Sequence, residues 1–207
     1  MWSREKSYPG GLVIIDGISG TGKTMVAHLL RTLKNVSSPR FNYSLENLLV
    51  SAGHGVISSE DVAALVSLAL DKDRLDDRIS REVNFRWGDL SSVLSSPDRV
   101  RYLAQALQSG HSLGVSRDLV GQPRTLSYIV HGVFAHVDFL AGQSNPYVHL
   151  ICTRHPNFLF EHWKSYSSSF FNNPRDLTLE RDRGGGGLHW YLNRSFDEFG
   201  NAGAADR

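Results

Sequence analysis

The stretch that most constrains the fold of this chain is residues 12–24, where a short apolar run leads into a glycine-rich segment. Residues 12–15 are all apolar and most of them are β-branched, which predicts a strand buried on both faces. Residues 17–24 fit the pattern G-x-x-x-x-G-K-[ST] at every fixed position. The apolar residues beyond the pattern recur at helical spacing, so we expect a helix over about 23–34 that begins inside it.

This succession of strand, glycine-rich loop and helix is typical of a phosphate-binding loop. Glycines let the backbone turn tightly, so that successive N–H groups face a phosphate, and the start of a helix adds its positive dipole end. Lys23 is expected to reach the terminal phosphates as a point charge, and Thr24 to offer its hydroxyl to Mg²⁺. We therefore expect a nucleotide to be bound by Gly17, Ser19, Gly20, Thr21, Gly22, Lys23 and Thr24.

Two more apolar runs, over 125–131 and 147–153, predict strands, and helical patterns over 133–140 and about 156–166 follow them. With the first strand this makes three strand-then-helix units, an order typical of a parallel sheet with right-handed crossovers. The fold class expected is α/β, with a doubly wound parallel sheet and helices on both faces. A single domain over residues 1–207 is expected.

Other segments constrain the fold less. Residues 41–50 have mixed periodicity, so both a short strand and a helix stay open. Pro97 is expected to open a helix that runs to about Gln108. Residues 40–110 form a candidate helical insertion on the substrate side. Residues 184–207 begin with a run of glycines and are read as a flexible or truncated tail.

Composition narrows the class of protein. Of the 207 residues, 41% are apolar and 21% charged, with a net charge of +1, which is ordinary for a soluble globular protein and favours neither nucleic acid nor a membrane as partner. Cys152 is the sole cysteine and lies in an apolar run, so we expect a buried, inert thiol and a cytoplasmic location. Neither a signal peptide nor a membrane-spanning run is expected, and the oligomeric state is left open.

Residues 71–86 are dense in charges of both signs. One interpretation is a solvated helix with ion pairs between successive turns. The other concerns residues 81–89, where polar and aromatic side chains crowd without helical or strand periodicity, as in a loop that faces a substrate. In that interpretation Glu82, Arg86 and Trp87 are the candidates to line the acceptor site.

The carboxyl ends of the three strands should meet at one edge of the sheet, where open parallel sheets bind their ligands. Asp16 ends the first strand, and two roles are open for it: general base and holder of a Mg²⁺-bound water, or a carboxylate that caps the amides of the loop. Arg154, after the third strand, suits bidentate binding of phosphate or sulfate, against a plain surface ion pair. His131, after the second strand, is either a base or a packed histidine.

Two resemblances follow from these residues. Residues 13–24 resemble the phosphate loop of nucleoside and nucleoside-monophosphate kinases, within the P-loop NTPase superfamily, and that resemblance implies ATP bound by the loop and Asp16 as base. Residues 147–166 look like sulfotransferases, in which an Arg-x-Pro follows a central strand. There the arginine, here Arg154, grips the 3′-phosphate of the sulfate donor PAPS, and a serine eight residues on, here His162, assists.

The leading functional hypothesis is therefore an ATP- and Mg²⁺-dependent phosphotransferase acting on a small-molecule acceptor. Asp16, Lys23 and Arg154 would be its catalytic residues, and Thr24 and Asp16 would hold the metal. A PAPS-dependent sulfotransferase, which needs no metal, is the alternative. A non-catalytic nucleotide-binding domain is the third, since no acid follows the strand that ends at His131. Arg175, Arg181 and Arg183 are read either as a phosphate-gripping lid or as a solvated loop.

Overall fold

The computed structural model describes residues 7–53, 55–89, 91–107, 121–140 and 146–162, together with the backbone of 178–179 and 188–189. Within these ranges the fold is α/β and is built on one parallel sheet. Its strands are β1 (Leu12–Asp16), β2 (Arg40–Phe41), β3 (Leu126–Ile129) and β4 (Tyr147–Ile151), in the order β2-β3-β1-β4. A separate antiparallel pair consists of β5 (Thr178–Leu179) and β6 (Leu188–His189).

β1 lies at the centre of the parallel sheet. It pairs with β3 on one side, in the register Leu12 to Leu126, and with β4 on the other, in the register Leu12 to Tyr147. The chain passes from β3 to β4 across β1, so the connections change direction beside β1. Such a switch point leaves a crevice at the carboxyl edge of an open sheet, which is where ligands bind.

The helical segments expected to begin at residues 23, 97, 133 and 156 all begin within two residues of those positions. The helices are α1 (Lys23–Leu30), α2 (Tyr43–Gly53), α3 (Ser59–Arg78) and α4 (Arg99–Ala106), with 3-10 helices η1 (Val93–Ser95) and η2 (Val133–Leu140) and a helical segment over 156–162. Two expectations need correction: the helix expected over 23–34 ends at Leu30, and the one over 133–140 is a 3-10 helix. The mixed segment 41–50 contains both alternatives, because β2 ends at Phe41 and α2 begins two residues later.

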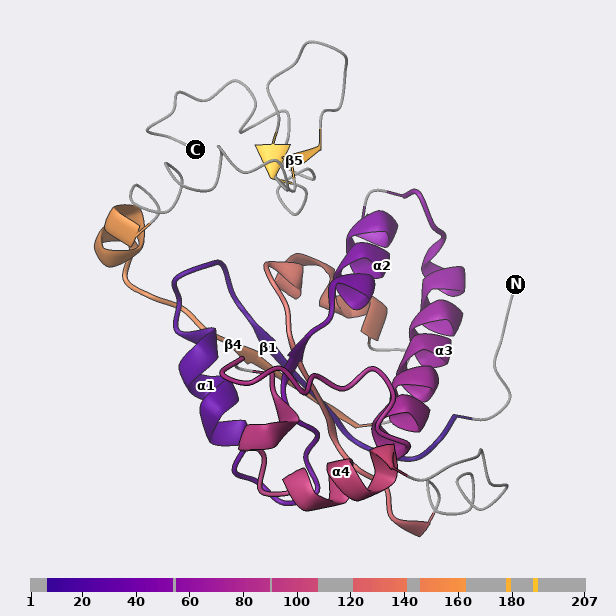
Figure 1. The fold of residues 1–207 in the computed structure, drawn as a ribbon. Coiled ribbons are helices and arrows are strands. Elements are labelled where there is room, and N and C mark those ends of the chain that lie inside the picture. Colours follow the sequence, from indigo (N-terminus) through magenta and orange to yellow (C-terminus); the bar gives the residue numbers. More distant parts are fainter. Residues whose placement is uncertain are drawn as a thin grey trace.

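Helices cover both faces of the sheet (Figure 1). Successive residues of a strand point to opposite faces, and β1 shows the consequence. Ile14 packs in the larger apolar cluster, which includes residues of α2, α3 and η2, whereas Ile15 packs with Ala27 of α1. In Figure 1, α2 and α3 lie side by side. Every residue of β3, and every residue of β1 except the half-buried Val13, is buried, as expected for a parallel sheet.

α3 changes character along its length. Its first half buries an apolar face, Val62, Val66 and Leu70, and its second half buries charged side chains, namely Asp71, Arg74, Asp76 and Asp77. The interpretation of 71–86 as a solvated helix is therefore wrong at these positions. They face inward because ionic partners from other elements meet them, such as Arg124 before β3.

The segment proposed as an insertion, 40–110, contributes a strand of its own, since β2 pairs with β3. Most of the tail 184–207 and the arginines at 175, 181 and 183 lie outside the described residues. Of the helices that the structure describes, none has both the length and the apolar character needed to cross a membrane.

Candidate functional site

The glycine-rich loop follows the carboxyl end of β1 and has the backbone that its sequence requires. Gly17, Gly20 and Gly22 have φ angles of +134°, +85° and +95°, a region that side-chain-bearing residues rarely adopt. A Cβ at Gly17 would lie 2.4 Å from the carbonyl oxygen of Cys152, and one at Gly20 would lie 2.3 Å from the ring of His162. Replacing Gly17 therefore requires the backbone at Cys152 to move, and replacing Gly20 requires the side chain of His162 to move.

Lys23, the first residue of α1, lies inside this loop. Its side chain is buried, and its Nζ donates to the carbonyl oxygens of Gly17 and of Ile18, the latter at 3.0 Å. Among the described residues, no hydrogen bond is donated by the backbone N–H groups of Ser19 and Gly20. The loop thus surrounds one cationic group and has free N–H donors beside it, which is the arrangement that binds a phosphate.

The pKa of Lys23 is lowered from its ordinary value of 10.5 by burial, while the charges of Asp16 and Glu46 act in the opposite direction. Because a phosphate attracts only the protonated amine, the predicted binding of a nucleotide by this loop should weaken as the pH rises, before 10.5 is reached. The free protein should behave oppositely: its free energy of unfolding should rise between the lowered pKa and that of the unfolded chain. Calorimetric titration of nucleotide at several alkaline pH values tests this, and an affinity that stays constant throughout would contradict it.

Arg154 reaches the same loop from the end of β4. Its Nη1 donates to the carbonyl oxygen of Gly20 at 3.2 Å, and its guanidinium lies over the ring of Phe158 at 5.7 Å. The side chain is otherwise exposed. The structure therefore brings together Lys23 and Arg154, two cations more than a hundred residues apart in sequence, at one edge of the sheet.

Asp16 is completely buried beneath the loop. Its Oδ1 accepts from the backbone N–H groups of Gly17, at 2.6 Å, and Val133, at 3.3 Å, and its Oδ2 lies 3.0 Å from Nε2 of His149. These contacts are the ones expected if Asp16 caps the amides of the loop. Its roles as base and metal holder stay predictions, whereas Thr24, exposed in the first turn of α1, leaves its hydroxyl accessible to an ion.

A second buried acid, Glu46 of α2, was missed in the sequence. Its Oε1 lies 3.0 Å from Nδ1 of His131, and its Oε2 has no hydrogen-bond partner among the described residues. In the neutral tautomer of His131 that donates from Nδ1 to the Glu46 carboxylate, Nε2 is the nitrogen left to accept a proton. The sequence does contain one signal that Glu46 is buried. It shares one helix face with Leu49 and Val50, where an apolar residue is the norm.

Three aromatic rings lie beside this pair, at the carboxyl end of β2 and β3. The rings of Phe41, Tyr43 and His131 are nearly parallel, with interplanar angles of 2–12° and centroids 5.6–6.3 Å apart. Phe41 is 42% exposed and Tyr43 49%. A planar molecule can therefore stack on this group of rings next to the basic nitrogen of His131.

A cavity of about 230 Å³ follows the β2 edge of the sheet. Glu82 lines it, as do its neighbours Val83 and Asn84, so part of the loop 81–89 does face a cavity. The other two acceptor-lining candidates behave differently, because the side chain of Arg86 and the residue Trp87 are 81% and 85% exposed. The remaining lining residues are Ser37, Ser38, Arg40, Phe41, Asp77, Ser91, Val93 and Tyr102.

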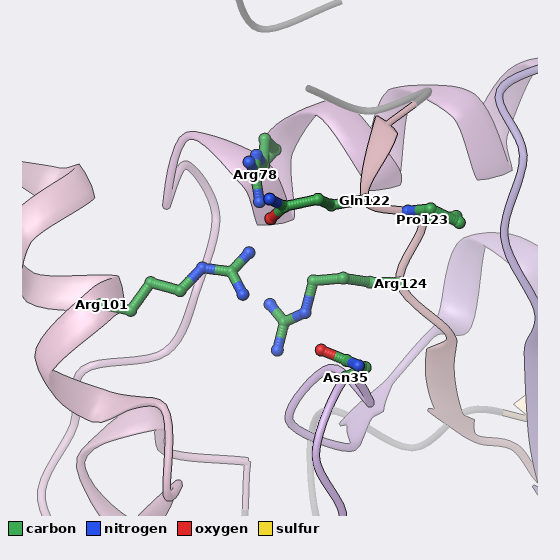
Figure 2. Close-up of a pocket in the computed structure, with 6 residues that line it drawn as sticks. All are labelled: Asn35, Arg78, Arg101, Gln122, Pro123 and Arg124. Atoms are coloured by element: carbon green, nitrogen blue, oxygen red, sulfur yellow. The ribbon is translucent and has the colours of Figure 1, made fainter. Parts of the chain in front are cut away.

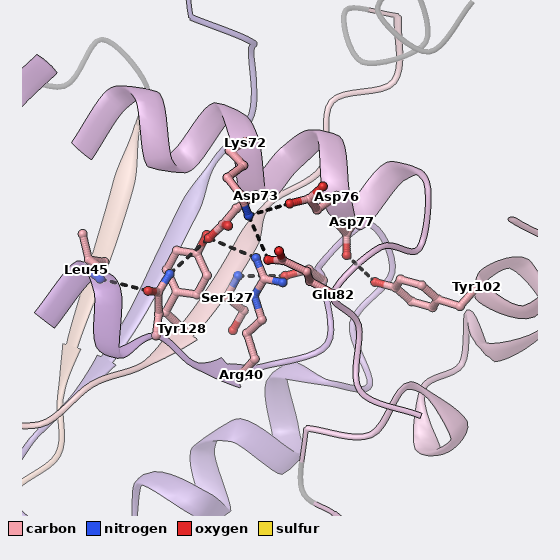
Figure 3. A network of polar contacts seen from close by, with 12 residues as sticks. Arg40, Leu45, Lys72, Asp73, Asp76, Asp77, Glu82, Tyr102, Ser127 and Tyr128 are labelled. Atoms are coloured by element: carbon pink, nitrogen blue, oxygen red, sulfur yellow. Dashed lines mark hydrogen bonds and ion pairs between the residues drawn. The ribbon is translucent and has the colours of Figure 1, made fainter. Parts of the chain in front are cut away.

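Three carboxylates beside that cavity, those of Asp73, Asp76 and Glu82, lie within 4.8 Å of one another. Cationic side chains already neutralise them: Lys72 Nζ lies 2.8 Å from both Asp76 and Glu82, and Arg40 Nη2 lies 3.0 Å from Asp73 (Figure 3). The cluster is therefore an ionic network that joins α3 to β2 and to the loop after α3.

Cys152 is only partly buried, which corrects the expectation of a buried thiol, and burial raises the pKa of that thiol, which favours its protonated form. No family model matches this chain, and neither a curated protein nor a solved structure does so.

Proposed function

We propose that this chain has a doubly wound, P-loop NTPase-like fold that binds a nucleoside triphosphate in the loop 17–24 and transfers its terminal phosphoryl group to a small-molecule acceptor. The observation that carries the proposal is the position of Lys23. Its amine is held inside a loop of left-handed glycines, at the edge of the sheet beside the switch point at β1.

In this proposal the loop and Arg154 supply the electrostatic stabilisation. Phosphoryl transfer needs mainly positioning and positive charge around the equatorial oxygens. Lys23 and the free backbone N–H groups would bind the donor phosphates, and Arg154 would approach from β4, displacing its contact with Gly20. Mg²⁺ would be held by the hydroxyl of Thr24 and by the phosphates themselves, with Asp16 acting through a bound water.

Two groups can accept the proton of the attacking hydroxyl. One is Asp16, as the resemblance to nucleoside kinases implies. The other is His131, whose ring is oriented by the buried Glu46 and lies next to the exposed rings on which an acceptor can stack. The contacts favour His131, because both carboxylate oxygens of Asp16 already have protein partners.

Replacing each base separately distinguishes these roles. We expect His131→Gln to lower kcat by about 10²- to 10⁴-fold, the usual contribution of a positioned base, and to leave nucleotide affinity within about twofold. Asp16→Asn should weaken nucleotide binding as well, because the amide cannot accept from the loop N–H and from His149 together. ADP release from ATP, measured with a set of small hydroxyl-bearing acceptors, is the assay. Unchanged kcat in His131→Gln would return the role of base to Asp16.

The contact of Arg154 with Gly20 also favours a second candidate, a PAPS-dependent sulfotransferase, in which Arg154 would bind the 3′-phosphate. Thermal denaturation with ATP and Mg²⁺, with PAPS, and with its product PAP separates the two, since a ligand that binds only the folded state raises the melting temperature once its concentration exceeds its Kd. Stabilisation by ATP only with Mg²⁺ supports the kinase-like function, and stabilisation by PAP without metal supports the sulfotransferase. Nucleotide binding without turnover of any acceptor would indicate a non-catalytic domain.

A further inference from the structure

A second cavity, of about 260 Å³, lies at the opposite edge of the sheet from the glycine-rich loop. β1 and β3 are parallel neighbours. Arg124 lies just before the start of β3, whereas the glycine-rich loop follows the end of β1, so the two lie at opposite edges of the sheet. The cavity is lined by Asn35, Arg78, Arg101, Gln122, Pro123 and Arg124. Three of the six are arginines, drawn from α3, α4 and the segment before β3.

The guanidinium groups of Arg101 and Arg124 point toward one another across this cavity, with Arg78 beside Gln122 (Figure 2). Like charges this close repel. Burial lowers the pKa of Arg101, and the charges of Arg124 and Arg78 lower it further. Nη2 of Arg101 and Nε of Arg124 are buried without a hydrogen-bond partner among the described residues. Such unpaired charged donors are rare in folded proteins and call for a missing ligand.

Among the residues that the structure describes, the nearby acids do not neutralise Arg101. Asp77 and Asp98 each lie 2.7 Å from Arg124, one at each of its terminal nitrogens, so both carboxylates are committed to Arg124. They act on Arg101 only at longer range and do not offset the lowering of its pKa. A negative charge from outside the chain would offset it.

We propose that this arginine cavity binds a phosphate group carried by a small polar molecule, as a site separate from the glycine-rich loop. Guanidinium groups pair with phosphate through parallel N–H donors. A phosphate dianion carries two negative charges, so it neutralises an excess of positive charge better than a carboxylate does. The volume lies just below the roughly 300–1,000 Å³ of pockets that enclose drug-sized ligands, which favours a small phosphate-bearing molecule over an enclosed nucleotide. The amides of Asn35 and Gln122 can donate to and accept from hydroxyl groups on the body of such a ligand.

The test is calorimetric titration of the full chain, in buffer free of phosphate and sulfate, with inorganic phosphate and separately with glycerol 3-phosphate. Arg101→Gln should weaken binding of the tighter probe by at least about tenfold, since it removes a charge-assisted contact. The matched control is Arg99→Gln, which makes the same charge change at an exposed position of α4 and should stay within about twofold of wild type. Tighter binding of glycerol 3-phosphate than of inorganic phosphate would identify a phosphate ester as the ligand, and the reverse order free phosphate.

Lys23→Ala separates this proposal from the nucleotide site. If phosphate binding survives in Lys23→Ala and is lost in Arg101→Gln, the arginine cavity is the site, whether or not the loop binds a nucleotide. Loss of phosphate binding in Lys23→Ala alone, or equal binding in wild type and Arg101→Gln, would overturn the proposal.

The melting temperature of Arg101→Gln without ligand is the second measurement. Because the change removes repulsion, the variant should be at least as stable as wild type in phosphate-free buffer. A clear drop would show that Arg101 already has its counter-charge, which overturns the proposal. Arg101→Lys, which keeps the charge and loses the planar fork, should bind phosphate with an affinity between those of wild type and Arg101→Gln.

Discussion

Replacing Lys23 with alanine is expected to weaken nucleotide binding by at least about 100-fold while the chain still folds. The amine of Lys23 is the cation enclosed by the glycine-rich loop, and charge-assisted hydrogen bonds to phosphate contribute about 1.5–3 kcal/mol each. The fold should tolerate the change, because it removes a partly desolvated charge along with its hydrogen bonds. Isothermal titration with ATP and Mg²⁺ measures the affinity, and circular dichroism with thermal denaturation checks folding.

Lys34→Ala is the matched control, since Lys34 lies exposed just beyond α1 and the same charge is lost there. Its affinity for ATP should stay within about twofold of wild type. A Lys23→Ala protein that binds ATP as wild type does would remove the phosphate-loop assignment. That result would also contradict the transferase proposal, but it would not affect the proposed phosphate site in the arginine cavity.

The largest loss of stability is expected from Asp77→Asn. This buried carboxylate accepts from Tyr102 Oη at 2.7 Å and from Arg124 Nη1 at 2.7 Å. The amide has nearly the same shape but lacks the charge, so Arg124 would remain buried with Asp98 as its one remaining counter-charge in the described part of the chain. Breaking one partner of a buried ion pair costs about 3–5 kcal/mol, and chemical denaturation measures that change in the free energy of unfolding.

Two further variants make this prediction sharper. Asp138→Asn, at an exposed position of η2, should change the free energy of unfolding by less than about 0.5 kcal/mol. The double variant Asp77→Asn with Arg124→Gln should cost less than the sum of its parts, because each single change already breaks the shared contact. Additive effects, or a small loss in Asp77→Asn alone, would show that this ion pair does not stabilise the junction of α3 with β3.

The loop and its flanking elements could be predicted because their causes are local. The apolar run of β1 requires burial whatever surrounds it, and the left-handed backbone at Gly17 and Gly20 requires glycine. Helical spacing likewise locates the start of α1 at Lys23. Its end is less certain, and the structure ends α1 at Leu30, short of the predicted boundary.

The burial of charged residues in the second half of α3 could not be predicted from local sequence. Alternating charges on a helix are typical of a solvated face, and nothing near Asp77 in sequence indicates otherwise. Asp77 is buried because Tyr102 and Arg124 approach it from 25 and 47 residues away. Burial of a charge depends on its partners, and the sequence does not show which partners the fold supplies.

The sequence by itself therefore determined the parallel α/β architecture around β1 and the glycine-rich loop, since strand burial, glycine backbone and helix periodicity act within a few residues. Only the tertiary structure decided which side chains meet there. It placed Arg154 on Gly20, oriented His131 with Glu46, capped the loop with Asp16, and gathered three arginines at the opposite edge. These contacts join segments that are far apart in the chain, so they depend on the order and register of the strands. No local sequence pattern encodes strand order or register.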